Sequence, residues 1–234
     1  MNVGAETSIG RVRDTNEDAF WADKGLLVVC DGMGGHQAGE VASAMAVNSI
    51  RSYPFQFQDS AAEVREAILK AHAEIAKAAA QDPAMHGMGT TVTMALCIDA
   101  PDGAEVVVGH VGDSRCYAYV NGELCRITND HSVVGELTRQ GTISPEEAVL
   151  HPQRHVLSQA LGIGEVEVEV HRVFLPSGAR ILLCSDGLTD VLSDAEIKQQ
   201  IAKAVPQEAA KNLVALANAH GGRDNITVIV AQVP

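Results

Sequence analysis

The chain has 234 residues, 46% of them hydrophobic, and its 17 Lys and Arg against 30 Asp and Glu give a formal net charge of −13. This length suits one large domain or two small ones, and a single core could bury roughly 70–75% of the unfolded surface. A charged fraction of 20% beside so much hydrophobic sequence excludes a disordered chain. The acidity argues against nucleic acids and anionic membranes as partners, because a strongly negative chain repels phosphate groups.

The five cysteines argue against a disulfide framework, because their number is odd and no short regular spacing separates them. Most lie in or beside hydrophobic runs, so we expect buried free thiols in a reducing compartment. Residues 1–10 lack the basic and hydrophobic regions of a secretory signal, and the hydrophobic runs are too short to cross a membrane. These features predict a soluble, cytoplasmic protein.

Short hydrophobic runs bounded by Gly, Asp or Asn are typical of buried strands. The runs are Leu26–Cys30, Thr91–Ile98, Val106–Val108, Ile181–Cys184 and Ile226–Ala231. A further segment, Val166–Val170, alternates Val with Glu. This alternation predicts a strand with one solvated face, near the edge of a sheet.

Four segments have hydrophobic residues at helical spacing instead. They span residues 42–50, 64–75, 197–205 and 210–217. Capping-box patterns at Ser60–Glu63 and Ser193–Glu196 predict where the second and third helices begin, and Gly221 and Gly222 close the last.

Strands in succession without intervening helices favour antiparallel sheets, with the helices packed on their outer faces. We therefore predict a single α+β domain over residues 1–234, a β-sandwich of two antiparallel sheets flanked by helices on both outer faces. The stretch from about residue 130 to 164 is polar and helical, with a third capping box at Ser144–Glu147. It is expected to form a small subdomain, here called the flap, laid over the sandwich.

Acidic residues recur where hydrophobic runs end, with glycine close by. The instances are Asp31-Gly32, Gly112-Asp113 and Asp186-Gly187. Asp224, after Gly221-Gly222, stands just before a predicted strand, and an earlier acidic pair is Glu17-Asp18. A single Asp-Gly pair usually marks a turn, but repetition at strand ends predicts carboxylates that converge on one point. Converged carboxylates repel one another unless cations neutralise them, and ligands that are all oxygen suit Mg²⁺ or Mn²⁺.

Several other chemistries lack their motifs. The chain has no Gly-x-Ser-x-Gly elbow, no Gly-Lys-Ser/Thr of a P-loop and no His-Glu-x-x-His of a zinc protease. No cysteine is followed six residues later by arginine, as a phosphocysteine mechanism would require.

Eight motifs follow one another along nearly the whole chain. They are Arg13-x-x-Asn16-Glu17-Asp18, Asp31-Gly-Met-Gly-Gly-His36, Gly39-Glu40, Gly89-Thr-Thr91, Gly109-His-Val-Gly-Asp113-Ser-Arg115, Asp130-His-Ser132, Ser185-Asp186-Gly-Leu-Thr-Asp190 and Gly222-Arg-Asp224-Asn225. In this order they resemble the metal-dependent type-2C (PPM) serine/threonine protein phosphatases of bacteria. The resemblance implies hydrolysis of phosphoserine or phosphothreonine by a water that bridges two Mg²⁺ or Mn²⁺ ions.

The resemblance also implies the metal ligands. Asp31 would bridge the two ions, Asp186 and Asp224 would complete the first, and the Gly32 carbonyl would serve the second. Asp113 with Asp186 would hold a third, looser ion. No side-chain nucleophile is needed for this reaction, because the ions activate the water.

Other residues would act around the ions. Glu17 would serve the second ion, Asp18 would orient its water, and Arg13 would bind the substrate phosphate bidentately. Met33 stands where animal members have a histidine, so a water is the first choice of proton donor and His36 the second. Packing or loop hydrogen bonds are an equally good interpretation of His36.

The flap departs from the family pattern at His155 and Gln159, where Asn and Arg are expected, and this affects substrate preference. The implied partners are phosphorylated protein substrates, including a Ser/Thr kinase and its targets in bacterial signalling. The chain itself is expected to be a monomer. Two alternatives stay open: a catalytically silent phosphoprotein-binding regulator, and a phosphohydrolase for small molecules.

Overall fold

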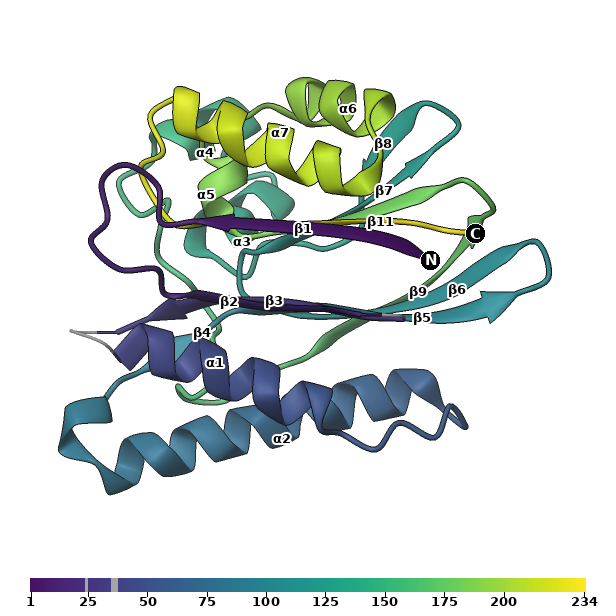
Figure 1. Cartoon of the computed structure of the whole chain (residues 1–234). Helices are drawn as coiled ribbons and strands as arrows, with labels where there is room; N and C mark the ends of the chain where they lie inside the picture. The colour runs from purple at the N-terminus through teal and green to yellow at the C-terminus, as the bar shows by residue number, and fades with distance from the viewer. Residues whose placement is uncertain (24, 35–37) are drawn as a thin grey trace.

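The computed structural model describes residues 1–23, 25–34 and 38–234. Two antiparallel sheets lie face to face, with helices on both outer faces, as Figure 1 shows. The predicted β-sandwich flanked by helices is therefore confirmed.

The first sheet contains both ends of the chain, and every neighbouring pair in it is antiparallel. Its strand order is β1-β11-β10-β7-β8. The bounds are β1 (Asn2–Ser8), β7 (Arg115–Val120), β8 (Glu123–Arg126), β10 (Arg180–Cys184) and β11 (Ile226–Gln232). Pairing of β1 with β11 places the two termini side by side (Figure 1).

The second sheet has the order β2-β3-β5-β6-β9, and the short β4 pairs with β3. The bounds are β2 (Asp18–Asp23), β3 (Leu26–Met33), β4 (Gly89–Thr90), β5 (Val92–Ala100), β6 (Gly103–Val111) and β9 (Glu169–Pro176). The strand predicted at Val166–Val170 begins only at Glu169, but β9 does lie at the edge of the sheet.

Two helical layers cover the sandwich. Helices α1 (Ala38–Arg51) and α2 (Ser60–Gln81) pack on the second sheet, and α6 (Asp194–Lys203) and α7 (Pro206–Ala219) pack on the first. The four-residue α5 (Asp186–Thr189) follows β10 and lies near α7 (Figure 1).

The continuous hydrophobic runs have a simple explanation in this layering. In β3, Leu27 and Val29 face the core between the sheets, whereas Val28 and Cys30 face the helical layer. Successive side chains of a strand point to opposite faces, so a strand buried on both faces needs no polar alternation.

Capping explains where most of the helices begin. The box at Ser193 is confirmed, because its hydroxyl accepts from the Glu196 N–H while the Glu196 carboxylate accepts from the Ser193 N–H. The box predicted at Ser60 is wrong by one residue. Asp59 is the N-cap of α2, and Glu63 instead accepts from backbone N–H groups of residues 56–58.

The flap contains α3 (Val133–Arg139) and α4 (Pro145–Leu150), followed by an irregular segment. The capping box at Ser144 is confirmed. Isolated bridges from Leu161 to Thr90 and from Leu157 to Ser132 join this segment to β4 and to the start of α3. The flap therefore lies against the end of the second sheet at which β3 and β4 meet.

All five cysteines are free thiols, and Cys125 is the exposed one. No helix in the described part of the chain combines the length and the hydrophobicity needed to cross a bilayer.

Candidate metal centre

A cavity of about 580 Å³ opens where the ends of the two sheets meet the flap. Seven of the predicted site residues line it: Arg13, Glu17, Asp31, Gly32, Asp113, Asp186 and Asp224. The convergence expected from repeated carboxylates at strand ends is therefore observed.

Both sheets contribute to this convergence. Asp31 lies near the end of β3 in the second sheet, and Asp113 lies in the turn that connects β6 to β7 across the sandwich. Asp186 is separated from the end of β10 by Ser185 alone, and Asp224 stands two residues before β11. Because the strands end at the same edge of the sandwich, residues far apart in sequence meet in one cavity.

Asp31 and Asp186 lie at the centre of the carboxylates, and their side chains contact each other. Burial, and then the charge of Asp18, raises the pKa of Asp31 well above its usual value. Burial, and then the charge of Asp113, does the same for Asp186. One oxygen of Asp186, Oδ1, is buried without a hydrogen-bond partner. An ionised carboxylate in this setting requires a cation.

Asp18 lies behind the cavity wall rather than on it. Its Cα is paired with that of Asp31 across β2 and β3, and the Ser185 hydroxyl donates to its Oδ2 at 2.8 Å. Burial raises the pKa of Asp18 to about 6, and its Oδ1 is buried without a partner. Asp18 thus lies next to Asp31, behind the surface of the cavity.

Burial raises the pKa of Asp113 to about 7, and the charges of Asp130 and Asp190 act in the same direction. The turn that carries Asp113 is held by His131, whose backbone N–H donates to the Gly112 carbonyl at 2.7 Å. The His131 ring in turn contacts Glu169 at 3.1 Å. His131 therefore positions this turn, and it does not line the cavity.

Gly32 has no room for a side chain. A Cβ at this position would come within 2.1 Å of the Gly39 carbonyl oxygen and 2.6 Å of the Glu17 carbonyl oxygen. The Gly32 N–H donates to that Glu17 oxygen at 3.1 Å. Glycine thus lets β3 lie directly against α1 and the Glu17 backbone, which brings the backbone of residue 32 to the cavity wall.

Arg13 is close to the carboxylates but already has a partner. Its Nη2 donates to Asp224 Oδ2 at 2.7 Å, and its side chain is 55% exposed. Burial raises the pKa of Glu17, and the Arg13 charge partly offsets the increase. Arg13 therefore lines the cavity with its guanidinium paired to Asp224.

Two residues that support the site, Asn225 and Thr91, were not among the predicted site residues. Asn225 accepts from the Glu17 N–H at 2.8 Å and donates to the carbonyls of Ile9 and Thr15, which fixes the segment bearing Arg13. Thr91 accepts from the Asp31 N–H at 3.0 Å. The only signal in the sequence was that these polar residues stand in or beside the motifs. Their hydrogen bonds could not be predicted, because the partners are distant in sequence.

The flap forms one wall of the cavity. It contributes His155, Leu157, Ser158, Gln159, Ala160 and Ile163. His36, the candidate proton donor, lies outside the described residues.

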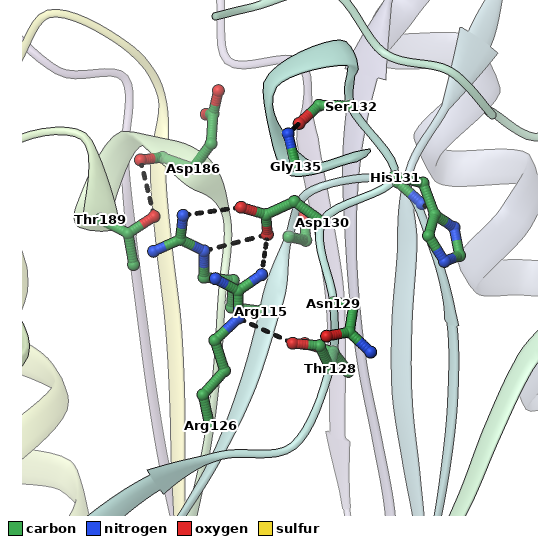
Figure 2. A network of polar contacts seen from close by, with 12 residues as sticks. Arg115, Arg126, Thr128, Asn129, Asp130, His131, Ser132, Gly135, Asp186 and Thr189 are labelled. Carbon is green, nitrogen blue, oxygen red and sulfur yellow. Dashed lines mark hydrogen bonds and ion pairs between the residues drawn. The ribbon is translucent and has the colours of Figure 1, made fainter. Parts of the chain in front are cut away.

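An arginine–carboxylate network holds the start of the flap, as Figure 2 shows. Arg115 binds both carboxylate oxygens of Asp130, at 3.0 and 2.8 Å, and Arg126 pairs with the same carboxylate. The Arg139 side chain donates to the Asp130 carbonyl at 2.7 Å. Asp130 therefore connects β7 and β8 to α3.

The donor set suits hard divalent cations, because the central groups are buried carboxylates with two unpartnered oxygens and raised pKa values. Fold and site together define a helix-flanked β-sandwich with an oxygen-lined metal centre at one end.

Comparison with known proteins gives the family. The family model for protein phosphatase 2C matches residues 8–219. The serine/threonine protein phosphatase PstP of Mycobacterium tuberculosis is 39% identical over the whole chain, and the serine/threonine phosphatase stp of Listeria monocytogenes is 37% identical over 99% of it. The solved catalytic domain of PstP in complex with two manganese ions matches at a TM-score of 0.90, with 38% identity over 99% of this chain and 97% of that domain.

This chain belongs to the protein phosphatase 2C family. It spans 45% of the length of the Mycobacterium protein and 96% of the Listeria protein.

Proposed function

We propose that the chain is a metal-dependent protein serine/threonine phosphatase. The observation that carries the proposal is the set of buried carboxylates in one cavity, with raised pKa values and unpartnered oxygens. The names of the relatives support the same activity, and the two manganese ions of the PstP catalytic domain support the choice of cation.

The proposed ligands follow from the placement of the residues around the cavity. Asp31 would be shared by two ions, Asp186 and Asp224 would complete one, and the Gly32 carbonyl and Glu17 would serve the other. Asp113 with Asp186 would hold a third. Such cations lower the pKa of water and neutralise the charge of phosphate oxygens.

The side chains around the ions bind and orient the substrate. Arg13 would exchange its contact with Asp224 for the phosphate oxygens, because a guanidinium binds phosphate through two parallel hydrogen bonds. Asp18, held by Ser185, would keep a water in line with the scissile bond. His36 stays a candidate proton donor.

The proposed substrates are phosphoserine and phosphothreonine in proteins, among them a kinase and its targets. The flap supports a protein substrate, because it gives the cavity an exposed wall that a polypeptide can contact. The proposal also treats residues 1–234 as one catalytic domain that acts as a monomer in the cytoplasm.

Hydrolysis of p-nitrophenyl phosphate tests the proposal. The chain should hydrolyse it with Mn²⁺ and lose the activity in EDTA. The Asp186→Ala variant should lose at least about 100-fold in kcat, because the central ion then lacks a ligand. Asp102→Ala, in the exposed turn between β5 and β6, is the matched control and should keep full activity.

Activity that persists in EDTA or in Asp186→Ala would contradict the metal centre. A phosphopeptide panel then separates the substrate classes. Preference for phosphopeptides over sugar and nucleotide phosphates is expected, and the reverse preference would contradict a protein substrate.

A further inference from the structure

A histidine of α2 contacts the last turn of the flap. The Gly162 N–H donates to Nδ1 of His72 at 3.1 Å, and the two residues are 90 positions apart in the chain. Gly162 stands in the turn at residues 160–163, whose first and last residues are joined by an isolated bridge. Those two residues, Ala160 and Ile163, line the cavity. The hydrogen bond from Gly162 is therefore made inside a turn that forms part of the cavity wall.

This turn fits closely against α2 and β4. Gly162 has a φ of +87°, and a Cβ at this position would come within 2.4 Å of Ile75 Cγ2 on α2. Leu161 is fully buried and exchanges two backbone hydrogen bonds with Thr90 of β4. Glycine thus allows the backbone to approach the helix until its N–H reaches the His72 ring.

The contact requires a neutral imidazole. In a neutral imidazole one nitrogen carries a proton, and only the other nitrogen can accept a hydrogen bond. Because Nδ1 of His72 is the acceptor, its proton lies on Nε2. A protonated ring would present an N–H to the Gly162 N–H, so the hydrogen bond would be lost. The half-buried Gly162 N–H would then need water as its partner, and the turn would separate from α2.

The surroundings of His72 favour this neutral form. Burial lowers the pKa of His72 below its usual value of 6.5, and burial is the sole cause of the shift. A histidine with a lowered pKa keeps its neutral form above pH 6.5 and is protonated only as the pH falls further. The hydrogen bond to Gly162 is therefore intact near neutral pH and is lost in acid.

Charged groups near His72 are few and have other partners. The residues three and four positions away on α2 are hydrophobic: Ile68, Leu69, Ile75 and Ala76. Lys70 and Glu74 pair with each other at 3.9 Å, and the turn at 160–163 carries no charge before Glu165. Of the elements packed on α2, the short helix η1 (Pro83–Met85) has no charged residue, and α1 has charges only near its two ends.

We propose that His72 is a positioning residue that holds the turn at 160–163 in the cavity wall, and that protonation of its imidazole releases this turn. The inference rests on the proposed function, because the wall matters only when a phosphorylated substrate enters the cavity. His72 itself does not line the cavity. Its loss should therefore raise KM for a phosphopeptide and leave kcat unchanged.

Two substitutions separate the hydrogen bond from the size of the side chain. His72→Asn keeps an acceptor oxygen close to the position of Nδ1 and cannot titrate, whereas His72→Leu has a similar size and no acceptor. His86→Leu is the matched control, because His86 is an exposed histidine in the loop between η1 and β4.

Hydrogen exchange of the metal-free chain at pH 7.5 measures the contact without any activity. The peptide covering residues 157–164 should exchange about fivefold faster in His72→Leu, as expected for the loss of one hydrogen bond. His72→Asn and His86→Leu should exchange as the wild type does. Unchanged exchange of this peptide in His72→Leu would overturn the inference. Faster exchange throughout that variant would also overturn it, because His72 would then stabilise the whole fold rather than the turn.

Kinetics with Mn²⁺ and a phosphopeptide measure the consequence. At pH 7.5, KM should rise about fivefold in His72→Leu with kcat within about twofold, and His72→Asn should keep the wild-type KM. Between pH 7.5 and 5.5, KM should rise more in the wild type than in His72→Asn. The ratio of the two chains cancels the titration of the phosphate and the metal ligands, which both share.

A fall in kcat alone, or the same pH dependence of KM in the wild type and His72→Asn, would overturn the role of His72. A wild-type chain without phosphopeptide activity would contradict the proposed function instead. In that case the exchange experiment still decides whether His72 holds the turn.

Discussion

At the scale of single residues, the site contains buried polar atoms without a hydrogen-bond partner and a glycine without space for a side chain. Asp186 Oδ1 and Asp18 Oδ1 are buried without hydrogen bonds, and Gly32 is enclosed by backbone on two sides. Groups of this kind reduce the stability of the metal-free fold, because buried polar atoms lose their hydration. Their presence together, in and directly behind the wall of one cavity, indicates a site built for a ligand.

Gly32→Ala should destabilise the chain by about 3 kcal/mol, because its Cβ would overlap the Gly39 carbonyl and force β3 away from α1. Metal affinity should fall in parallel, since the Gly32 carbonyl would move. Urea unfolding in EDTA and Mn²⁺ titration measure the two effects.

Gly122→Ala is the control for this substitution. Gly122 has a φ of +85° but open space around it, so alanine should cost about 1 kcal/mol there through backbone strain alone. Equal losses in the two variants would contradict the steric argument at Gly32.

At the scale of elements, the flap is held to the sandwich through a small number of polar contacts. The Asp130 carboxylate accepts from Arg115 and Arg126 (Figure 2). The Asp130 carbonyl accepts from Arg139. The Asp130 side chain is 14% exposed and that of Arg115 is 24% exposed. A pair this buried is costly to break, because the remaining charge is left without a partner.

Asp130→Asn should therefore cost about 3 kcal/mol of unfolding free energy and should increase amide hydrogen exchange in α3. Glu123→Gln, which breaks the exposed Lys198–Glu123 pair, should change stability by less than about 0.5 kcal/mol. Denaturant unfolding and hydrogen-exchange mass spectrometry give both quantities. A loss in Asp130→Asn as small as that in Glu123→Gln would show that the network does not hold the flap.

At the scale of the whole molecule, the net charge of −13 is unevenly distributed. Six carboxylates gather at one end of the sandwich, in or behind one cavity: Glu17, Asp18, Asp31, Asp113, Asp186 and Asp224. Because burial raises the pKa of several of them, the folded metal-free protein binds protons more tightly than the unfolded chain. Stability then decreases as pH rises.

The metal-free protein should lose stability between pH 6.5 and 8. The pKa of Asp113 is about 7 in the fold against a usual value of 3.8, so its contribution is present at low pH and is lost as pH rises through 7. His110 acts oppositely, because burial lowers its pKa to about 4 from 6.5, but only the last part of that effect falls in this window and it offsets the decrease in part. We expect a decrease of about 1 kcal/mol, or roughly 2–4 °C in Tm.

Thermal unfolding in EDTA and in saturating Mn²⁺ measures this dependence. Mn²⁺ should raise Tm and remove the slope, because bound ions keep the carboxylates ionised. Asp113→Asn should have a smaller slope in EDTA than the wild type. A metal-free protein that is more stable at pH 8 than at pH 6.5 would contradict the assignment.

Much of the fold could be predicted because its determinants are local. Hydrophobic runs and helical spacing located β3, β5, β10, β11 and the four long helices, and the capping boxes at Ser144 and Ser193 are confirmed. β1 was not predicted, because residues 2–8 mix polar and small residues and become a strand by pairing with β11 at the other end of the chain. The N-cap at Asp59 was missed because two neighbouring residues both suit a cap.

The sequence by itself determined the chemistry of the site: which carboxylates recur beside glycines at strand ends, and that oxygen ligands suit hard cations. The tertiary structure alone decided how those groups are used. It paired Arg13 with Asp224, set Asp18 behind the cavity wall, and brought His155 of the flap to Asp186 and Asp190. Residue type is a local property, whereas burial, pKa and contacts between segments distant in sequence arise only when the two sheets pack together.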